Sequence, residues 1–310
     1  MTYQLDLSQF PNLLSPDGEP AVDESHLTFL DSALHAEWGL GRNLILVWCP
    51  LENSIELLVT PHYALSEYVA KSNRGNNNPA DMLNDPYERS RRSGNAIESV
   101  ISGPKQVEQK ELRHLCDLLG YESVRIDLPF SPGTEVPCHM IEMLIKRYGI
   151  SYVDDRAVAL FDIVGFSLLS PLEQVTQLNS LAFSVNSAYS KMLSNNIDIS
   201  FARTTTGDGF YIWNRDRSIQ ANVNLYHFMH LALADNAIAT QKSTTKLTPL
   251  LRAAFHVGGH YEFYQSEGLS PTLYSYIVGD VTIELARMLE CALPGQVLVG
   301  DFWIPMPDWE

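Results

Sequence analysis

Two aspartates, each beside an apolar run and close to a glycine, are the residues that most directly suggest chemistry. Asp162 ends the apolar run 157–161, and Asp208 lies between two glycines ahead of the apolar run 210–212. Either pattern alone is typical of a strand that leads into a turn. Two carboxylates at neighbouring strand ends would suit Mg²⁺ bound to a nucleoside triphosphate, because Mg²⁺ keeps several waters and takes one or two carboxylates plus phosphate oxygens. The pair therefore predicts phosphoryl chemistry.

The elements that must position the two aspartates follow them in a definite order. An amphipathic helix over 171–183 comes after Asp162, with Ser170 before it and proline in its first turn. A second long helix comes after Asp208. Three blocks then follow, Leu-Arg-Ala-Ala-Phe-His-Val-Gly-Gly at 251–259, a segment from Tyr276 to Glu290, and Pro-Gly-Gln-Val-Leu-Val-Gly at 294–300.

This order of blocks resembles the catalytic domain of class III adenylate and guanylate cyclases. The resemblance covers roughly residues 152–305, about half of the chain. In that family the domain is a ferredoxin-like α+β unit that works as a dimer and converts a nucleoside triphosphate to a 3′,5′-cyclic monophosphate and pyrophosphate. The resemblance therefore implies an α+β fold, a nucleotidyl cyclase domain over 151–310 and a homodimer.

The resemblance also implies roles for individual residues. Asp162 and Asp208, with the backbone carbonyl of Ile163, would hold two divalent ions, Mg²⁺ or Mn²⁺, in each active site. Arg287 matches an arginine that the partner protomer directs at the charge on the α-phosphate, a task suited to its planar, permanently charged guanidinium. Four further residues would contact the substrate: Phe166, Thr204, Gly207 and Tyr276.

Several positions depart from the family pattern. Thr204 stands where adenylate cyclases carry a base-selecting lysine, and Tyr276 stands where they carry an aspartate, so the base is open between adenine and a pyrimidine. Ile283 replaces an asparagine and cannot orient a ribose by hydrogen bonding, and Glu284 beside it is a poor neighbour for a triphosphate. The family's terminal hairpin, which carries a phosphate-binding lysine, has no counterpart before Glu310, so either the sequence stops short of it or the site lacks that cation.

Two other functions compete with an active but atypical cyclase. The first is a catalytically silent, cyclase-like signalling module that binds a nucleotide or a partner protein. The second is an enzyme of related palm-like topology that joins nucleotides, which the blocks at 251–259 and 276–287 disfavour. We favour the active enzyme because the departures fall on base and ribose recognition, whereas both aspartates and Arg287 are present.

The first half of the chain predicts a separate small domain. Helical spacing is present over 23–37, two strands are expected at 43–50 and 54–60, and a helix and a strand at 105–119 and 123–128. These elements favour an N-terminal α+β domain over 1–134 that regulates or dimerises, of the GAF or PAS kind by fold analogy.

Two further segments complete this half of the chain. The polar, Asn- and Gly-rich stretch 72–96 predicts a long loop, and 135–150 predicts a helix that connects the two domains. We interpret Trp48 and Cys49 as core residues of a strand, with a ligand pocket as the alternative.

Composition excludes several classes of function. The formal net charge of −16 opposes a nucleic-acid partner, since phosphate backbones are held by clustered Lys and Arg. No apolar stretch approaches the ~20 residues of a membrane helix and no signal-like start is present, so we expect a cytoplasmic protein without a membrane partner.

Cysteines and histidines are scattered singly along the chain. The four cysteines form no Cys-x-x-Cys pair, which favours free thiols over zinc or disulfides. We interpret His256 as a strand residue. His227 and His230 lie three residues apart without a third ligand, so we expect ordinary helix residues there.

Overall fold

The computed structural model describes residues 22–65, 97–216, 218–243, 248–266 and 273–303. The protein is of the α+β type, and its contacts divide it into two compact units. The first unit comprises Met1–Tyr152 with Glu262–Tyr276, and the second comprises Val153–Tyr261 with Ile277–Glu310. Within the described ranges, no helix has the length and apolar character needed to cross a membrane.

The first unit is built on a three-stranded antiparallel sheet of order β1-β2-β3. Its strands are β1 (Asn43–Leu51), β2 (Ser54–Pro61) and β3 (Ser123–Asp127). Leu51 pairs with Ser54, so a two-residue turn at Glu52 and Asn53 joins β1 to β2, as the sequence predicts.

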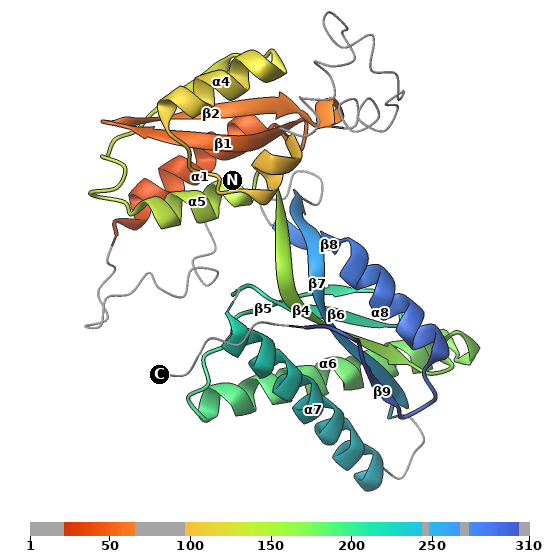
Figure 1. Ribbon diagram of the computed structural model, residues 1–310. Coiled ribbons are helices and arrows are strands. Elements are labelled where there is room, and N and C mark those ends of the chain that lie inside the picture. Colours follow the sequence, from red (N-terminus) through yellow and green to blue (C-terminus); the bar gives the residue numbers. More distant parts are fainter. Residues whose placement is uncertain (1–21, 66–96, 217, 244–247, 267–272, 304–310) are drawn as a thin grey trace, which may run out of the picture. The chain divides into compact units, whose positions relative to one another are not determined.

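Helices cover both faces of this sheet. Helices α1 (Glu24–Trp38) and α5 (Cys138–Lys146) pack on one face, and α4 (Gln109–Leu119) packs on the other (Figure 1). A β-bulge between Ile45 and Val47 shifts the alternation of β1, so Leu46 and Val47 both face α4 while Trp48 faces α1 and α5. Trp48 is fully buried and Cys49 is buried, which confirms their assignment to the core.

The elements predicted for the first half are present, with shifted ends. The helix expected at 105–119 begins at Gln109, and the helix expected over 135–150 is the shorter α5. The apolar face of α5 is buried in the core of the first unit, so this helix packs as part of that unit. The predicted loop at 72–96 lies outside the described residues.

A six-stranded sheet contains the strands of the second unit and has the order β5-β6-β4-β7-β8, with β9 paired to β7. The strands are β4 (Ile150–Ile163), β5 (Phe201–Thr205), β6 (Gly209–Asn214), β7 (Leu251–Ser266), β8 (Leu273–Val278) and β9 (Val297–Val299). Strand β6 is antiparallel to both β4 and β5, and β9 is parallel to β7. Strands β4, β7 and β8 contribute residues to both units.

Three helices cover the two faces of this sheet: α6 (Pro171–Ser194), α7 (Ile219–Lys242) and α8 (Asp280–Cys291). Ala159 and Phe161 of β4 pack with α6 and α7, whereas Val158 and Leu160 pack with α8. The helices themselves are labelled in Figure 1. A strand covered on both faces reads as a continuous apolar run, which explains the sequence before Asp162.

Helix α6 begins as the sequence predicts. Pro171 occupies the first turn, and Ser170 and Glu173 form a capping box in which the Ser170 N–H donates to Glu173 Oε2 at 2.8 Å. The start of the helix that follows the Asp162 strand is therefore set by local sequence.

Candidate functional site

Backbone hydrogen bonding places Asp162 and Asp208 at neighbouring strand ends. Asp162 is the penultimate residue of β4 and pairs with Gly209, the first residue of β6. The next residue, Ile163, donates its N–H to the carbonyl of Asp208 at 3.1 Å. The positions of both aspartates are therefore held by the β4–β6 pairing and do not depend on their side chains.

Each glycine beside Asp208 has its own structural reason. A Cβ atom on Gly209 would overlap the carbonyl oxygen of Phe161, so only glycine fits there. Gly207 has φ of +101°, a left-handed conformation that L side chains rarely adopt. The hydroxyl of Thr206 donates to Asp208 Oδ1 at 3.1 Å and fixes that carboxylate in the turn.

Arg252, at the start of β7, is the cation of this site. Its Nε donates to Asp162 Oδ2 at 2.6 Å, and its Nη1 donates to the carbonyl of Ala292 at 3.4 Å, just after α8. The side chains of Arg252 and Asp162 are 28% and 13% exposed, so the pair is largely shielded from solvent. A shielded ion pair of this kind is costly to break from one side.

Burial raises the pKa of Asp162 above its usual value. The ion pair with Arg252 opposes this shift, and the charge of Asp208 adds to it. The cation beside this pair of carboxylates in the structure is Arg252.

The donor atoms at this site fit a magnesium ion that a phosphate helps to hold. Two carboxylates and the nearby carbonyl of Ile163 are hard oxygen donors, and Mg²⁺ commonly takes one or two carboxylates and completes its shell with waters and phosphate. In the described ranges no group of three or more His, Cys, Asp or Glu residues could hold a metal ion by itself. These donors therefore fit a divalent ion only when further oxygen ligands complete its shell.

Sequence reasoning missed Arg252. In the block at 251–259 the sequence draws attention to His256, whereas the residue that contacts Asp162 is the arginine at the second position of the block. A charged residue in an otherwise apolar strand requires a partner when it is buried, and that signal is present in Leu-Arg-Ala-Ala-Phe.

Three of the predicted substrate-contacting residues lie in the second unit. Thr204 is half-buried on β5, where it pairs with Tyr211. Phe166 lies in a short 3₁₀ helix (Phe166–Leu168) and packs partly against the core beneath α6 and α7. Gly207 is exposed in the turn before Asp208.

The fourth residue, Tyr276, belongs to the first unit. It lies on β8 and stacks on Phe263 with a centroid separation of 5.7 Å and an interplanar angle of 23°. Its ring is therefore held by an aromatic neighbour on β7.

Arg287 and the two departures beside it lie on the exposed face of α8. Arg287 Nη1 donates to Glu284 Oε1 at 2.8 Å, and the two side chains are 67% and 48% exposed. Ile283 is also exposed, at 48%. None of the contacts described for Arg287 involves Asp162 or Asp208.

The histidines behave as the sequence predicts. His227 and His230 are exposed on α7. His256 is a half-buried residue of β7; burial lowers its pKa, although the charges of Glu284 and Asp301 act in the opposite direction. The described cysteines are all free, with Cys49 and Cys116 buried.

No protein-family model matches the chain, and no curated protein sequence matches it. Among solved structures, the chain is similar to the guanylate cyclase domain of RhGC from Catenaria anguillulae in complex with GTP, with 15% identity and a TM-score of 0.39 over 48% of this chain and 79% of that chain. It is also similar to the dimeric guanylyl cyclase domain of the RhoGC fusion protein from Blastocladiella emersonii, at 15% identity and a TM-score of 0.38, covering 48% and 81%. The adenylyl cyclase CyaB from P. aeruginosa gives 14% identity and a TM-score of 0.34, covering 48% and 78%.

Proposed function

We propose that this protein is a nucleotidyl cyclase of class III, which converts a nucleoside triphosphate to a 3′,5′-cyclic monophosphate and pyrophosphate. The observation that carries the proposal is the placement of Asp162 and Asp208 side by side at the ends of β4 and β6, with Arg252 paired to Asp162. The order of sequence blocks around these residues supports the same activity.

In this proposal Asp162, Asp208 and the carbonyl of Ile163 hold two Mg²⁺ or Mn²⁺ ions. When bound, such ions lower the pKa of the ribose 3′-hydroxyl and neutralise phosphate charge. Arg252, anchored beside the aspartates, supplies a fixed positive charge to the same phosphates. Repulsion between the carboxylates is then relieved by the bound ions as well as by the arginine.

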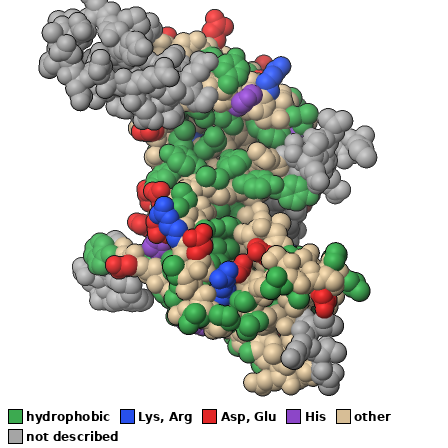
Figure 2. Space-filling model, turned by 90° about the vertical axis from the view of Figure 1, so that its right-hand side faces the viewer, with side chains coloured by type: hydrophobic (Ala, Val, Ile, Leu, Met, Phe, Trp, Pro, Cys, Tyr) green, Lys and Arg blue, Asp and Glu red, His purple; other side chains and the backbone are tan. Residues whose placement is uncertain are grey.

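The proposed active enzyme is a homodimer, with Arg287 directed at the α-phosphate bound by the partner protomer. Apolar side chains reach the surface in several places on the face shown in Figure 2. Around the start of α6, Leu168, Leu172 and Val175 are 88%, 77% and 65% exposed, which suits burial against a second chain. Arg287 must leave Glu284 when it engages a phosphate, a small cost for an exposed ion pair.

Base recognition is assigned to Thr204 and Tyr276, with Phe166 and Gly207 against the remainder of the substrate. Tyr276 offers a ring that stacks on any base and a hydroxyl that donates to a carbonyl. The resemblance to adenylate cyclases favours adenine as the base. Thr204 and Tyr276 replace the lysine and aspartate that select adenine in those enzymes, which leaves a pyrimidine as the alternative. The first unit would regulate or dimerise the enzyme, in the manner of a GAF or PAS domain.

A catalytically silent signalling module is the second candidate function. Arg287 already forms an ion pair with Glu284. Ile283 has no hydrogen-bonding group at the position where cyclases carry an asparagine that orients the ribose. Such a module would bind a nucleotide or a partner protein without turnover.

The test is incubation of the purified protein with ATP, GTP, CTP and UTP separately, in Mg²⁺ and then in Mn²⁺, with mass spectrometry for cyclic monophosphates. A cyclic product that disappears on chelation with EDTA supports the cyclase and names the base. Absence of product from all four substrates, with a folded dimeric protein, rejects the enzyme in favour of the silent module.

The matched variants are Asp208→Asn and Asp198→Asn. Asp208→Asn removes a proposed ligand without changing side-chain size, so we expect turnover to fall by at least about 100-fold, as for loss of a group that stabilises transition-state charge. Asp198→Asn makes the same change at an exposed aspartate before β5, and this control should leave turnover unchanged. Equal turnover in Asp208→Asn and the unmodified protein would show that the metal assignment is wrong.

A further inference from the structure

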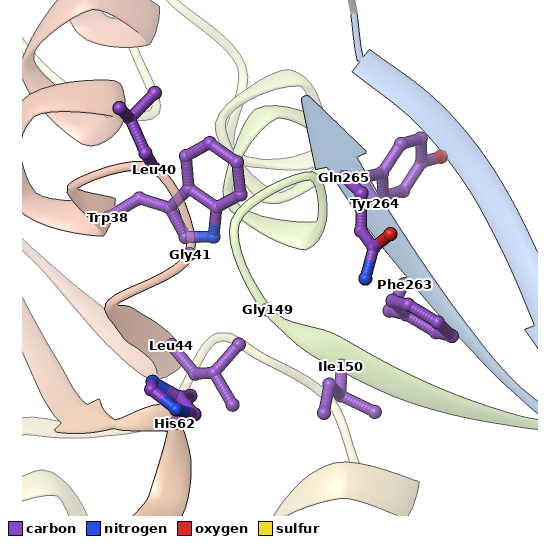
Figure 3. A pocket seen from close by; sticks show the side chains of 10 residues that line it. All are labelled: Trp38, Leu40, Gly41, Leu44, His62, Gly149, Ile150, Phe263, Tyr264 and Gln265. Carbon is purple, nitrogen blue, oxygen red and sulfur yellow. The ribbon is translucent and has the colours of Figure 1, made fainter. Parts of the chain in front are cut away.

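We infer that a pocket in the first unit binds a small, uncharged, planar heteroaromatic molecule that carries a lactam or amide edge. The pocket has a volume of about 370 Å³, within the usual size range of small-molecule sites. Its walls include Trp38, Leu44, Ile150, Phe263 and Gln265, with His62 at the rim (Figure 3). This inference goes beyond the proposed cyclase activity, because none of the lining residues belongs to the proposed catalytic site.

The described lining residues offer no formal charge to balance that of a charged ligand. None of the ten described residues around the pocket is Lys, Arg, Asp or Glu. A phosphate or a metal ion would lose its hydration here without gaining a counter-charge, which is unfavourable. The pocket therefore differs in chemistry from the anion- and metal-binding site proposed for the second unit.

The aromatic side chains of the lining favour a flat ligand. In Figure 3, Trp38 and Phe263 lie on opposite sides of the opening, and the aliphatic side chains of Leu44 and Ile150 complete the wall between them. Trp38 packs against Tyr148 with a centroid separation of 5.7 Å, and Phe263 stacks on Tyr276 at the same separation. Both rings are thus held in place before a ligand arrives. Trp38 is only 3% exposed and closes the pocket on the side of the core, so the half-buried Phe263 is the ring that a planar ligand would contact.

Gln265 supplies the polar contact that selects among planar molecules. Its carboxamide points toward the pocket in Figure 3, and no described residue takes up this group in a hydrogen bond. A carboxamide presents a donor and an acceptor side by side, so its complement is a ligand edge with an adjacent C=O and N–H, as in a lactam.

His62 provides a second polar group at the rim. Its Nδ1 lies 3.0 Å from the carbonyl oxygen of Arg42. A carbonyl only accepts, so Nδ1 carries the hydrogen in this contact, and Nε2 is an acceptor in that tautomer. A ligand that reaches the rim would therefore offer a donor to His62.

The test is isothermal titration calorimetry of the full chain with quinolin-2(1H)-one and, separately, with its N-methyl derivative. The two probes share their rings and carbonyl, but only the first has the lactam N–H. We expect saturable binding of quinolin-2(1H)-one with a Kd at or below about 1 mM. The N-methyl probe should bind about 5-fold more weakly, the effect of one hydrogen bond.

Three variants separate the lactam contact from the pocket itself. Gln265→Leu should bring the two affinities to within about 2-fold of each other, since the hydrogen-bonding group is gone. Leu44→Trp should fill the pocket and weaken both probes at least about 10-fold. Gln109→Leu, on α4 and away from the pocket, is the matched control and should preserve both affinities. Circular dichroism and thermal unfolding check that each variant is folded.

Two outcomes would overturn the inference. The first is an absence of saturable binding of quinolin-2(1H)-one to the unmodified chain. The second is a preference for the lactam probe that survives in folded Gln265→Leu. Either result is independent of whether the second unit makes a cyclic nucleotide.

Discussion

Two arginines of the second unit form ion pairs of different character. Arg252 pairs with Asp162 in a largely shielded position, whereas Arg287 pairs with Glu284 on the exposed face of α8. Solvent weakens the second interaction but has little access to the first. We therefore expect Arg252 to stabilise the fold in addition to its proposed role at the phosphates, and Arg287 to exchange Glu284 for a ligand at little cost.

Arg252→Ala should lower the free energy of unfolding by about 1–3 kcal/mol, because it leaves Asp162 mostly buried without its cation. Arg287→Ala, the matched control, should change it by less than about 0.5 kcal/mol. Urea unfolding of the two variants and the parent protein gives both values. Equal losses of unfolding free energy in the two variants would contradict the difference in burial between Arg252 and Arg287.

The cysteines make a second prediction at the residue scale. Burial raises the pKa of Cys49 and of Cys116, and the charge of Glu56 adds to both shifts. A raised pKa lowers the thiolate fraction at pH 8, and the thiolate is the reactive form. Cys291 is exposed.

We therefore expect a disulfide reagent such as DTNB to modify Cys291 rapidly at pH 8. Cys49 and Cys116 should react only as the protein unfolds. The Cys291→Ser variant should lose the fast phase and keep its unfolding midpoint. A fast phase that persists in this variant would place another thiol at the surface.

At the scale of elements, the junction of β4 and β6 decides the geometry of the candidate site. Gly209 allows β6 to begin directly against the Phe161 carbonyl, and Asn222 of α7 anchors the start of the buried part of β4. The Asn222 side chain accepts from the Ala157 N–H at 2.9 Å and donates to the Asp155 carbonyl at 2.9 Å. Both ends of this strand segment are thus fixed by specific contacts.

Gly209→Ala should destabilise the protein by about 3 kcal/mol or more, since the new methyl overlaps backbone that cannot move freely. Gly295→Ala is the control. Gly295 has φ of +78° and open space around it, so the cost there is conformational strain of about 1 kcal/mol. Chemical unfolding gives the stability of both variants. A smaller loss of stability in Gly209→Ala than in Gly295→Ala would contradict the close approach of Gly209 to the Phe161 carbonyl.

At the scale of the whole molecule, the two units are not consecutive in sequence. Residues of Glu262–Tyr276 belong to the first unit although more than a hundred residues of the second precede them. Tyr264 in this segment packs against the core that α1 and α5 form with the sheet. The first unit is therefore complete only when the distant end of β7 is present.

A fragment of residues 1–152 should unfold at a lower urea concentration than the first unit of the full chain. It should also fail to bind quinolin-2(1H)-one, because Phe263 and Gln265 are missing. Hydrogen exchange of the β1 and β2 amides reports the stability in both proteins. Equal protection in the fragment and the full chain would mean that Glu262–Tyr276 adds nothing to this unit.

Local sequence was sufficient for much of the secondary structure. The hairpin of β1 and β2, the start of α6 and the strand before Asp162 follow from turn residues, a capping box and a continuous apolar run, which act within a few residues of one another. The α+β class and the placement of both aspartates at strand ends also followed from the sequence.

The tertiary structure alone decided which distant residues meet. Arg252 reaches Asp162 across 90 positions of sequence, and Phe263 and Gln265 join Trp38 in one pocket. The packing of α5 against α1 and the first sheet also depends on partners far along the chain. Such contacts arise when separate elements pair or are buried against each other. A local sequence pattern predicts the element itself but does not predict which distant element it will contact.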